Sequence, residues 1–396
     1  MNKNSLKNGP DDLGYYGEGE SAMGGMAVGE TLMPALHELN LAFEDAIKDQ
    51  AFLDEFAYYC KHYIGRPSPL YFAENLSKKI GGAKILFKQE HLNHTGSHKI
   101  TNSLFQVLLA KRMGKKNLIC ESGAGQHYSA TAAVAAKFGI PLIGVMGEID
   151  IKRVNQNIIK AKHYGAKLKA VTGTLKEAIT DAIKTWITNP DYYYVCGSAV
   201  SSFPFPKIVQ FAQSIIGKEI REQCMKQEKK LPDMLIGCVG GGSNFIGSIH
   251  EFLDEPNIKK IGVEAAETAA LSNGTPGIMQ GMKTYMLQTE DGSKSLGGKS
   301  LGAGIQYFSV GPQHSYLKDQ GAVTYTSATD REILDAYKIV AQTEGISSAL
   351  EPMAAAAEVL KQAKDKPADF IIVLSLCGRG EKDLDTIEEH MGKDFE

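Results

Sequence analysis

From about residue 80 onward, short apolar runs alternate with segments in which apolar residues recur at helical spacing. This pattern predicts alternating strands and helices. Short apolar runs predict the strands, and the stretches between them predict helices. In one such stretch Ile100, Leu104 and Val107 recur at the spacing of a helix face. The predicted strands are AKILF (83–87), NLIC (117–120), PLIGVM (141–146), KLKAVT (167–172), YYYVC (192–196), DMLIGCVG (233–240), KKIGVEAA (259–266) and FIIVLSL (370–376). This alternation predicts an α/β fold with helices on both faces of a mostly parallel sheet.

The segment 267–329 interrupts the alternation, because it is rich in Gly, Ser and Thr and has few long apolar runs. We expect it to be irregular, as functional loops and partly disordered segments are. Two helices over about 330–344 and 351–364, followed by the strand at 370–376, are then expected to close the chain.

Composition and charge narrow the function classes. The chain has 396 residues, enough for two domains, and 43 basic against 46 acidic residues give a net charge of -3. No strong field favours nucleic acid or an anionic membrane, so we expect small-molecule chemistry. The six cysteines form no CxxC pair, which indicates a reducing compartment. The chain has no apolar leader segment and no apolar run of about 18 residues, so we expect a soluble cytoplasmic protein.

Polar, glycine-containing loops follow three of the predicted strands. Ligands of open α/β sheets bind at the carboxyl ends of the strands, so these loops are the first candidates for chemistry. They are QEHLNHTGSHK (89–99), ESGAGQH (121–127) and GGGSN (240–244).

The loop GGGSN lies between an apolar strand and a predicted helix. Bare glycine amides at a helix start suit a phosphate, whereas the alternative is a tight strand–helix turn. Ser243 as a helix cap and Asn244 favour the anion. Neither GxGxxG nor GxxxxGK[ST] is present, so neither a dinucleotide nor a nucleoside triphosphate is specifically indicated.

The loop ESGAGQH places the carboxylate of Glu121 at a strand end, followed by backbone amides that open onto a helix. Such amides suit the carboxylate of a substrate. The alternative is a glycine-rich turn in which Glu121 is a solvated acid favoured by the helix dipole. The loop alone does not decide between them.

Lys99 stands on the first turn of its predicted helix, where a cation opposes the helix dipole. It is either a solvated charge or a functional group. A desolvated lysine loses its proton easily and is a Schiff-base nucleophile. Together with a phosphate loop, it points to a phosphorylated aldehyde, pyridoxal 5'-phosphate.

Five motifs, in order and at compatible spacing, resemble the tryptophan synthase β-subunit family of fold-type II pyridoxal-phosphate enzymes. They are HLNHTGSHK, ESGAGQH, CVGGGSN, SVGPQH and GRGEKD, and the likeness extends to GETLMPAL and GRPSPLYFAENL near the start. The resemblance implies two three-layer α/β domains with mostly parallel twisted sheets. These would be an N-terminal domain of 1–62 plus 98–215, with a mobile subdomain at about 114–200, and a cofactor domain of 63–97 plus 216–396.

The resemblance also implies roles for individual residues. Lys99 would form the internal aldimine and move the α-proton, and Glu121 would act as acid and base on the serine hydroxyl and around the nucleophile. The phosphate would be held by His98, Gly240, Gly241, Gly242, Ser243 and Asn244. The substrate carboxylate would be bound by the backbone of Ser122, Gly123, Ala124, Gly125, Gln126 and His127. Glu351 and Cys377 would lie near the cofactor ring, and Gly240, Tyr307 and Ser309 near a monovalent cation, Na+ or K+.

Several positions depart from the family pattern. Gln306 replaces the Asp that closes over bound serine, and Cys377 replaces a serine opposite the pyridine nitrogen. Both Cys and Ser are neutral there, but a thiol is the weaker donor; the alternative for Cys377 is a buried, inert thiol. Related serine dehydratases of the same fold type can carry cysteine at this position. The other departures are Met279-Gln280 for Tyr-Phe, Ser201-Ser202-Phe203 for Gly-Pro-His, and GMAVGE (25–30) for GRFVPE.

The resemblance implies a pyridoxal-phosphate lyase that performs β-replacement on L-serine, with indole as nucleophile to give L-tryptophan. We expect a homodimer, with an α subunit as a further candidate partner. Two alternatives stay open. One is β-replacement with another nucleophile, or serine deamination; the other is a degenerate paralogue that no longer turns over.

Overall fold

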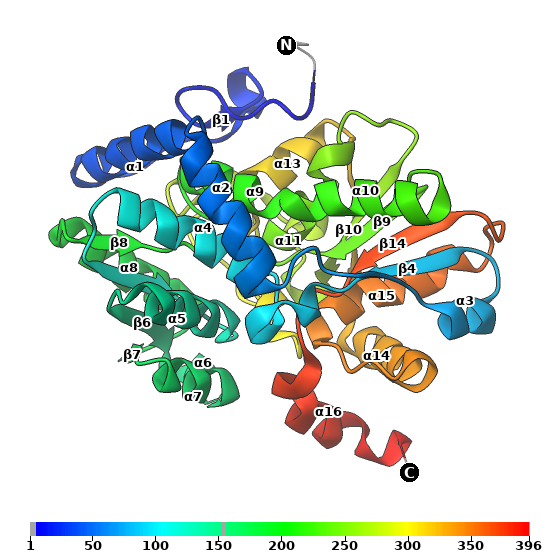
Figure 1. Ribbon diagram of the computed structural model, residues 1–396. Helices are drawn as coiled ribbons and strands as arrows, with labels where there is room; N and C mark the ends of the chain where they lie inside the picture. The colour runs from blue at the N-terminus through cyan, green and yellow to red at the C-terminus, as the bar shows by residue number, and fades with distance from the viewer. Residues whose placement is uncertain (1–4, 153–154, 396) are drawn as a thin grey trace. The chain divides into compact units, whose positions relative to one another are not determined.

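The computed structural model describes residues 5–152 and 155–395, and by its contacts the chain divides into two compact units (Figure 1). Unit 1 comprises Met1–Ala27, Ser68–Leu92 and Ser198–Glu396, and unit 2 comprises Val28–Pro67 and Asn93–Gly197. The chain therefore passes between the units several times, and each unit contains its own parallel sheet. No helix among the described residues is long and apolar enough to cross a membrane.

Unit 2 is built on a four-stranded parallel sheet in the order β7-β6-β5-β8. Its strands are β5 (Asn117–Glu121), β6 (Leu142–Gly147), β7 (Lys167–Val171) and β8 (Tyr192–Tyr194). Its helices are α1 (Met33–Ala46), α2 (Gln50–Tyr59), α4 (Lys99–Arg112), α5 (Gln126–Phe138), α6 (Glu148–Ile151), α7 (Asn155–His163) and α8 (Leu175–Thr188). Because β5 and β8 are parallel neighbours, with Ile119 opposite Tyr194, the loops that follow them start at the same sheet edge.

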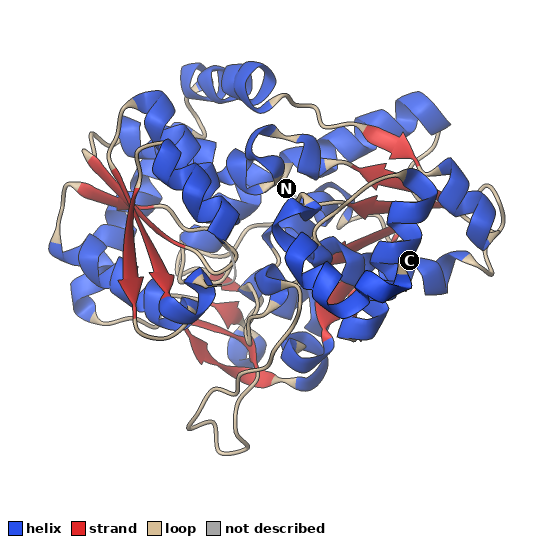
Figure 2. Ribbon diagram, turned by 90° about the horizontal axis from the view of Figure 1, so that it is seen from below, coloured by secondary structure: helices blue, strands red, loops and turns tan. Residues whose placement is uncertain are grey.

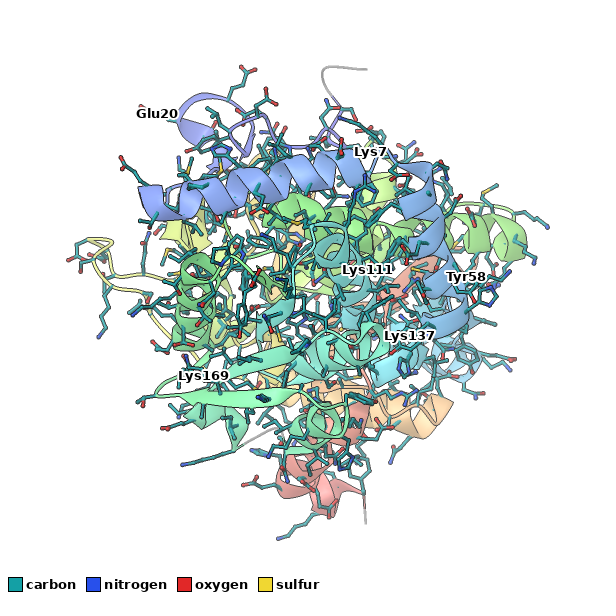
Figure 3. The ribbon with its side chains drawn as sticks, turned by 60° about the vertical axis from the view of Figure 1, so that its left-hand side comes forward. Lys7, Glu20, Tyr58, Lys111, Lys137 and Lys169 are labelled. Atoms are coloured by element: carbon teal, nitrogen blue, oxygen red, sulfur yellow. The ribbon has the colours of Figure 1, made fainter. Side chains whose placement is uncertain are left out.

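Cations on the surface of unit 2 pack against aromatic rings and join its helices. Lys111 forms an ion pair with Glu55 at 3.1 Å and lies 5.3 Å from the centre of the Phe138 ring. Lys137 lies 5.6 Å from the centre of the Tyr59 ring. Figure 3 labels both lysines. Each contact of this kind contributes only about 0.5–1 kcal/mol at an exposed site.

Unit 1 contains a six-stranded sheet in the order β13-β10-β9-β14-β4-β3, parallel except for β3 at its edge. The strands are β3 (Leu70–Phe72), β4 (Lys84–Lys88), β9 (Met234–Cys238), β10 (Lys259–Ala265), β13 (Thr324–Ala328) and β14 (Ile371–Ser375). The helices are α3 (Glu74–Ile80), α9 (Phe205–Gln213), α10 (Ile215–Glu228), α11 (Ser243–Ile249), α12 (Ala270–Asn273), α13 (Pro312–Asp319), α14 (Asp330–Glu344), α15 (Leu350–Ala363) and α16 (Leu384–Met391).

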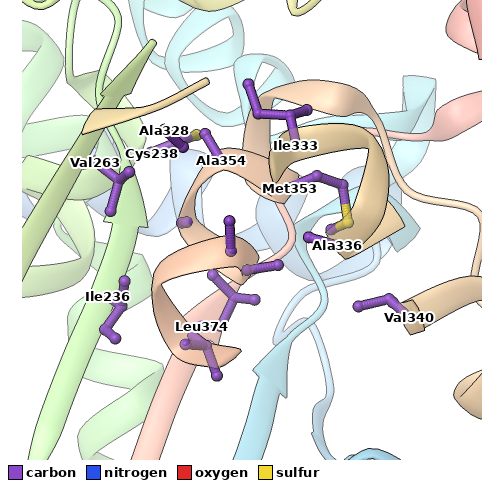
Figure 4. Close-up of a cluster of buried hydrophobic side chains, with 14 of the residues drawn as sticks. Ile236, Cys238, Val263, Ala328, Ile333, Ala336, Val340, Met353, Ala354 and Leu374 are labelled. Atoms are coloured by element: carbon purple, nitrogen blue, oxygen red, sulfur yellow. The ribbon is translucent and has the colours of Figure 1, made fainter. Parts of the chain in front are cut away.

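Two apolar clusters cover the two faces of this sheet. On one face, Ile236 and Leu374 of the central strands pack with Met353 of α15 and Val340 of α14 (Figure 4). On the other face, the intervening residues pack against α10 and α11. The central strands are buried on both faces, which is why they are continuously apolar rather than alternating. Figure 2 shows helices alongside the strands of each sheet, so the predicted three-layer α/β class is confirmed.

The prediction that 267–329 is irregular is right for 287–311, where a short 3-10 helix at Ala303–Ile305 is the one element among the described residues, and wrong for the rest. The segment contains α12, the hairpin of β11 (Thr275–Met279) and β12 (Met282–Met286), then α13 and β13. The hairpin turns at Gln280 and Gly281, whose φ angles are 49° and 77°. It joins β1 (Tyr15–Tyr16) and β2 (Met23–Gly24) in an antiparallel sheet.

The prediction that β14 closes the chain is also wrong, because α16 follows it. Ile387 and Met391 of α16 are buried in the same apolar cluster as Leu374. A helix of eight residues with two apolar anchors gives little periodicity to detect in a sequence.

The contact-based units group 1–27 and 198–215 with unit 1, whereas the division inferred from the sequence places both in the N-terminal domain. The reason is local pairing, since β2 bonds to β12 and α9 packs on α11. The division inferred from the sequence includes a mobile subdomain at about 114–200, and contacts within one structure do not test mobility. The inferred domains therefore stay a prediction.

Candidate active site

A polar stripe on α4 carries Lys99. Lys99, Asn102 and Gln106 are three and four residues apart and therefore share one face of the helix. Lys99 Nζ donates to the carbonyl of Gly197 at 2.5 Å. Asn102 and Gln106 donate to the carbonyl of Cys196 at 2.8 and 2.7 Å, and the Cys196 N–H donates back to Gln106 at 3.0 Å. The stripe thus fixes the backbone that follows β8, and with it the acceptor for Lys99.

Gly197 connects Lys99 to Glu121. Its carbonyl accepts from Lys99 Nζ, and its N–H donates to Glu121 Oε1 at 3.1 Å. A Cβ at this position would collide with the ring of His127, so the position requires glycine. Sequence reasoning missed Gly197, although a glycine directly after a strand end was a usable signal.

Glu121 is buried, with 5% of its surface exposed. Its Oε2 has no hydrogen-bond partner among the described residues. Burial raises the pKa of Glu121 to about 7, against the opposing effects of the Tyr194 hydroxyl, the Gly197 N–H and the Lys99 charge. The alternative of a solvated helix-start acid is therefore wrong. A carboxyl with this pKa can both give and accept a proton near neutral pH.

The loop after Glu121 leads directly into the N-terminus of α5. The Ser122 N–H donates to Val145 at 3.2 Å, and the Ala124 carbonyl accepts from Asn157 at 2.9 Å. Gly125, with φ 71°, precedes the 13-residue helix. The first N–H groups of a helix have no acceptor within the helix, so this held loop presents donors for an anion such as a carboxylate.

The side chain of His127 holds the backbone that follows β8. Its Nε2 donates to the carbonyl of Val195 at 2.8 Å, and the ring is buried. Burial, followed by the nearby charge of Lys99, lowers the pKa of His127 to about 3, so the ring is neutral at physiological pH. Any contribution of His127 to substrate binding therefore comes from its backbone.

In unit 1, the glycine loop Gly240–Gly242 joins β9 to α11 and is held by Gly311 and His314 at the start of α13. The Gly311 N–H donates to the Gly241 carbonyl at 3.1 Å, and His314 Nε2 donates to the Gly242 carbonyl at 2.8 Å. The Tyr325 hydroxyl bonds to His314 Nδ1 at 2.9 Å, which fixes the ring tautomer. Two carbonyls of the loop are therefore engaged by the protein itself.

The glycines of this loop have no room for side chains. A Cβ on Gly240 would lie 2.5 Å from the carbonyl oxygen of Gly304, and one on Gly241 would collide with Ser198. Gly242 has φ 88° and lies against the ring of His314. Close packing and a left-handed backbone together explain the triplet.

We predict that Gly242→Ala weakens both stability and cofactor binding. Its positive φ costs about 1–2 kcal/mol with a Cβ, and the collision with His314 adds about 1–3 kcal/mol. The matched control is Gly345→Ala, which has φ 66° but no described atom within 4 Å of its Cβ. Urea unfolding and cofactor titration should show the smaller loss for Gly345→Ala, with unchanged cofactor affinity. Equal effects of the two substitutions would show that the loop is not a close-packed cradle.

Asn244 lies on the first turn of α11 and is buried, with 4% of its surface exposed. Neither atom of its side-chain amide has a partner within 5–152 and 155–395. An unsatisfied buried amide costs about 1–3 kcal/mol, so a bound group is expected to satisfy it.

Glu351, on the first turn of α15, is held in a buried ionic cluster. Its Oε1 accepts from the Gly304 N–H at 2.7 Å and from Lys382 Nζ at 2.9 Å, and Lys382 also contacts Asp383 at 2.7 Å. Burial opposes ionisation, but the charge and hydrogen bond of Lys382 outweigh it and lower the pKa of Glu351. Its Oε2 is buried without a partner in the described part of the chain. Glu351 therefore offers a carboxylate oxygen to a ligand.

Several departures from the family pattern gather on the hairpin and on 201–203. Met279 ends β11, and Gln280 lies in the turn that follows. Phe203 is buried against Gly14, and its N–H donates to the Gly25 carbonyl at 3.2 Å. Gln306 donates to the Gly298 carbonyl at 3.2 Å. None of these positions carries the charge of an aspartate.

The remaining predicted residues divide between the units. His98 is the buried residue directly before α4 in unit 2. Tyr307 and Ser309 are buried in unit 1, where Gly240 packs against the neighbouring residues Gly304 and Ile305. The monovalent-cation site stays a prediction. So does the joining of His98 and the glycine loop in one phosphate site.

These residues fit pyridoxal 5'-phosphate. The side chains supply a primary amine and a proton-exchanging carboxyl in unit 2. Unit 1 supplies a glycine loop without room for a Cβ, an unsatisfied buried amide and an anchored carboxylate. Each part of the cofactor, the aldehyde, the phosphate and the ring, has a group of matching chemistry.

Comparison with known proteins agrees with this chemistry. The family model described as pyridoxal-phosphate dependent enzyme matches residues 62–378. The tryptophan synthase beta chain of Allorhizobium ampelinum is 48% identical, over 98% of both chains. That of Rhodopseudomonas palustris is 46% identical, over 99% of this chain and 98% of its own. A crystal structure of a threonine deaminase from T.th. matches with a TM-score of 0.63 and 19% identity, over 87% of this chain and 98% of that one. This last likeness shows the fold alone.

Proposed function

The chain belongs to the tryptophan synthase beta chain family of pyridoxal-phosphate-dependent enzymes, and from this we propose that it joins L-serine to indole to give L-tryptophan. The observation that carries the proposal is the pairing of Lys99 and Glu121 through Gly197. An amine and a buried carboxyl held by one backbone residue suit a reaction that moves two protons in sequence.

Pyridoxal 5'-phosphate, when bound, supplies the electron sink for loss of the α-proton of serine. Lys99 Nζ attaches the cofactor and takes this proton, oriented by the Gly197 carbonyl. Glu121 is about half protonated near pH 7, so it gives a proton to the departing serine hydroxyl and receives one from the indole that adds. Burial of Glu121 limits exchange of its proton with water.

The remaining site residues bind and orient. The backbone from Ser122 to His127 binds the serine carboxylate at the start of α5. Gly240–Gly242, Ser243, Asn244 and His98 hold the cofactor phosphate. Glu351 and Cys377 lie at the ring, and Gly240, Tyr307 and Ser309 bind Na+ or K+.

The proposal extends to assembly and compartment. We infer a cytoplasmic homodimer from the resemblance of the sequence motifs, and an α subunit as partner in an α2β2 complex because the relatives are named beta chains. The segment GMAVGE differs from the family pattern. Light scattering of the protein alone and with a tryptophan synthase α subunit tests both.

Reconstitution with pyridoxal 5'-phosphate and titration with serine test the proposal. We expect a yellow protein whose visible band changes on addition of serine, with little pyruvate released. Rapid pyruvate release would favour a serine deaminase. A band that does not respond to serine would favour a degenerate paralogue.

Gln306→Asp is predicted to increase kcat/KM for indole by about tenfold, the value of one charged hydrogen bond of about 1.5 kcal/mol. Gln306 offers only a neutral amide to the Gly298 carbonyl, whereas the family aspartate can hold a closed state through its charge. Gln306→Asn is the control, since it matches Asp in size without the charge. If Asp and Asn behave alike, the missing charge does not limit indole use.

A further inference from the structure

Two cysteines of unit 1 bring their sulfur atoms into contact. Cys238 Sγ and Cys377 Sγ are 3.6 Å apart, and the residues are 6% and 5% exposed. Both lie in the apolar cluster that includes Ala328 and Ala354, and Figure 4 labels Cys238 there. Neither forms a disulfide in this structure.

The backbone around the pair suits a disulfide. Cys238 ends β9, and Cys377 follows β14, its parallel neighbour, with Ile236 opposite Leu374. Continued by two residues, this register places Cys238 opposite Leu376, the neighbour of Cys377. With strands about 4.8 Å apart, an offset of one residue stays compatible with the Cα separations of about 4.4–6.8 Å that disulfides span. The two sulfur atoms need to approach by only about 1.5 Å to reach bonding distance.

The pair owes its existence to the departure at position 377. A serine at this position would leave Cys238 without a second sulfur in contact. Cys238 stands two residues before Gly240, and Cys377 precedes the motif with Lys382 and Asp383. A bond between them would therefore join the segment leading to the glycine loop to the segment that anchors Glu351.

We propose that Cys238 and Cys377 form an oxidisable site at which a peroxide makes an intramolecular disulfide. One thiol loses its proton and its sulfur attacks a peroxide oxygen, which breaks the O–O bond; the sulfur becomes a sulfenic acid, and the departing hydroxide takes up the released proton to give one water. The second sulfur attacks this sulfenic sulfur and releases another water. Two thiols and one hydrogen peroxide thus give one disulfide and two waters, and the two electrons pass from sulfur to peroxide.

Oxidation is expected to stop the formation of tryptophan reversibly. This expectation rests on the proposed function. The thiol of Cys377 would no longer be present at the cofactor ring, and the glycine loop would be tied to the segment after β14. A bound cofactor should shield the pair, so the cofactor-free protein should oxidise faster. A dithiol reductant restores both thiols by exchange.

The test uses the full chain, with and without pyridoxal 5'-phosphate, treated with hydrogen peroxide. We expect the loss of two of its six thiols, a cross-linked peptide containing Cys238 and Cys377 that lacks two hydrogens, and loss of most turnover. Dithiothreitol should reverse all three. Thiol counting and peptide mass do not depend on turnover, so they test the disulfide even if the proposed function fails.

Three variants of the pair and one control variant complete the test. Cys377→Ser restores the family residue, and Cys238→Ala and Cys238→Val remove the partner; the two Cys238 changes guard against a folding defect in either one. Each should keep most of its own initial turnover after peroxide treatment, whereas the wild type should lose most of its turnover. Cys224→Ala, a buried cysteine of the opposite cluster, should leave the response unchanged. A Cys238–Cys377 peptide absent from oxidised wild-type protein, or equal peroxide sensitivity in the Cys238 variants, would overturn the proposal.

Discussion

Lys99→Ala should abolish the covalent link between protein and cofactor and reduce tryptophan formation by at least about 10²–10⁴-fold, the range of a lost acid–base group. The reason is geometric. Lys99 Nζ is the amine that the Gly197 carbonyl orients beside Glu121. Borohydride reduction of the loaded protein, followed by peptide mass analysis, should locate the cofactor on Lys99 in the wild type and nowhere in the variant.

Lys137→Ala is the matched control for this substitution. Lys137 lies on α5 of the same unit, where its ammonium group packs against the Tyr59 ring. Its replacement should leave both the covalent link and turnover unchanged. A reducible link that persists in Lys99→Ala would assign the amine to another lysine.

Glu121→Gln should reduce turnover by about 10²–10⁴-fold, because an amide cannot exchange the proton that the carboxyl supplies. It should also change how stability depends on pH. Burial raises the folded-state pKa of Glu121 from 4.5 to about 7, so the folded protein holds the proton more tightly than the unfolded chain. The contribution of Glu121 to stability is therefore fully present below pH 4.5 and is lost as pH rises through about 7.

Glutamine does not ionise, so the variant should lack this decline. Its free energy of unfolding should exceed that of the wild type above about pH 7, by an amount limited to about 3 kcal/mol. Chemical unfolding across this pH range measures the difference. A variant with wild-type turnover, or with the same pH dependence of stability, would remove Glu121 from the proton-transfer role.

Glu264→Gln is the control for Glu121→Gln, because it shows what the loss of a buried carboxyl does to turnover when that carboxyl lies outside the proposed active site. Glu264 is also buried, its pKa is also raised to about 7, and it accepts from the N–H groups of Leu271 and Ser272 in unit 1. We expect its replacement to change stability and its pH dependence, with turnover kept within a few-fold. A loss of turnover as large as that of Glu121→Gln would mean that burial, not position, explains both results.

The sequence predicted the parts of this site whose signals are local. The strand ends, the polar loops and the first turn of α4 are contiguous in the chain, so Lys99, Glu121 and the glycine triplet could be found by position alone. Burial of Glu121 could not, because a carboxyl at a helix start is solvated or buried according to the strands around it.

The sequence did not predict residues that act through backbone hydrogen bonds or through contacts with residues far away in the chain. Gly197 has no side chain, yet its two backbone groups join Lys99 to Glu121. Lys382 lies in a motif that was recognised, but its contact with Glu351 spans 31 residues. The β11–β12 hairpin was missed because its turn contains Gln rather than Asn or Asp before Gly.

The proposed reaction is tested most directly by incubating serine labelled with ¹³C at Cβ with indole and the cofactor-loaded protein, and identifying the labelled product. We predict labelled tryptophan from the wild type, a trace at most from Lys99→Ala, and little pyruvate while indole is present. Labelled pyruvate as the main product, or no labelled product from a protein that binds the cofactor, would contradict the proposed reaction.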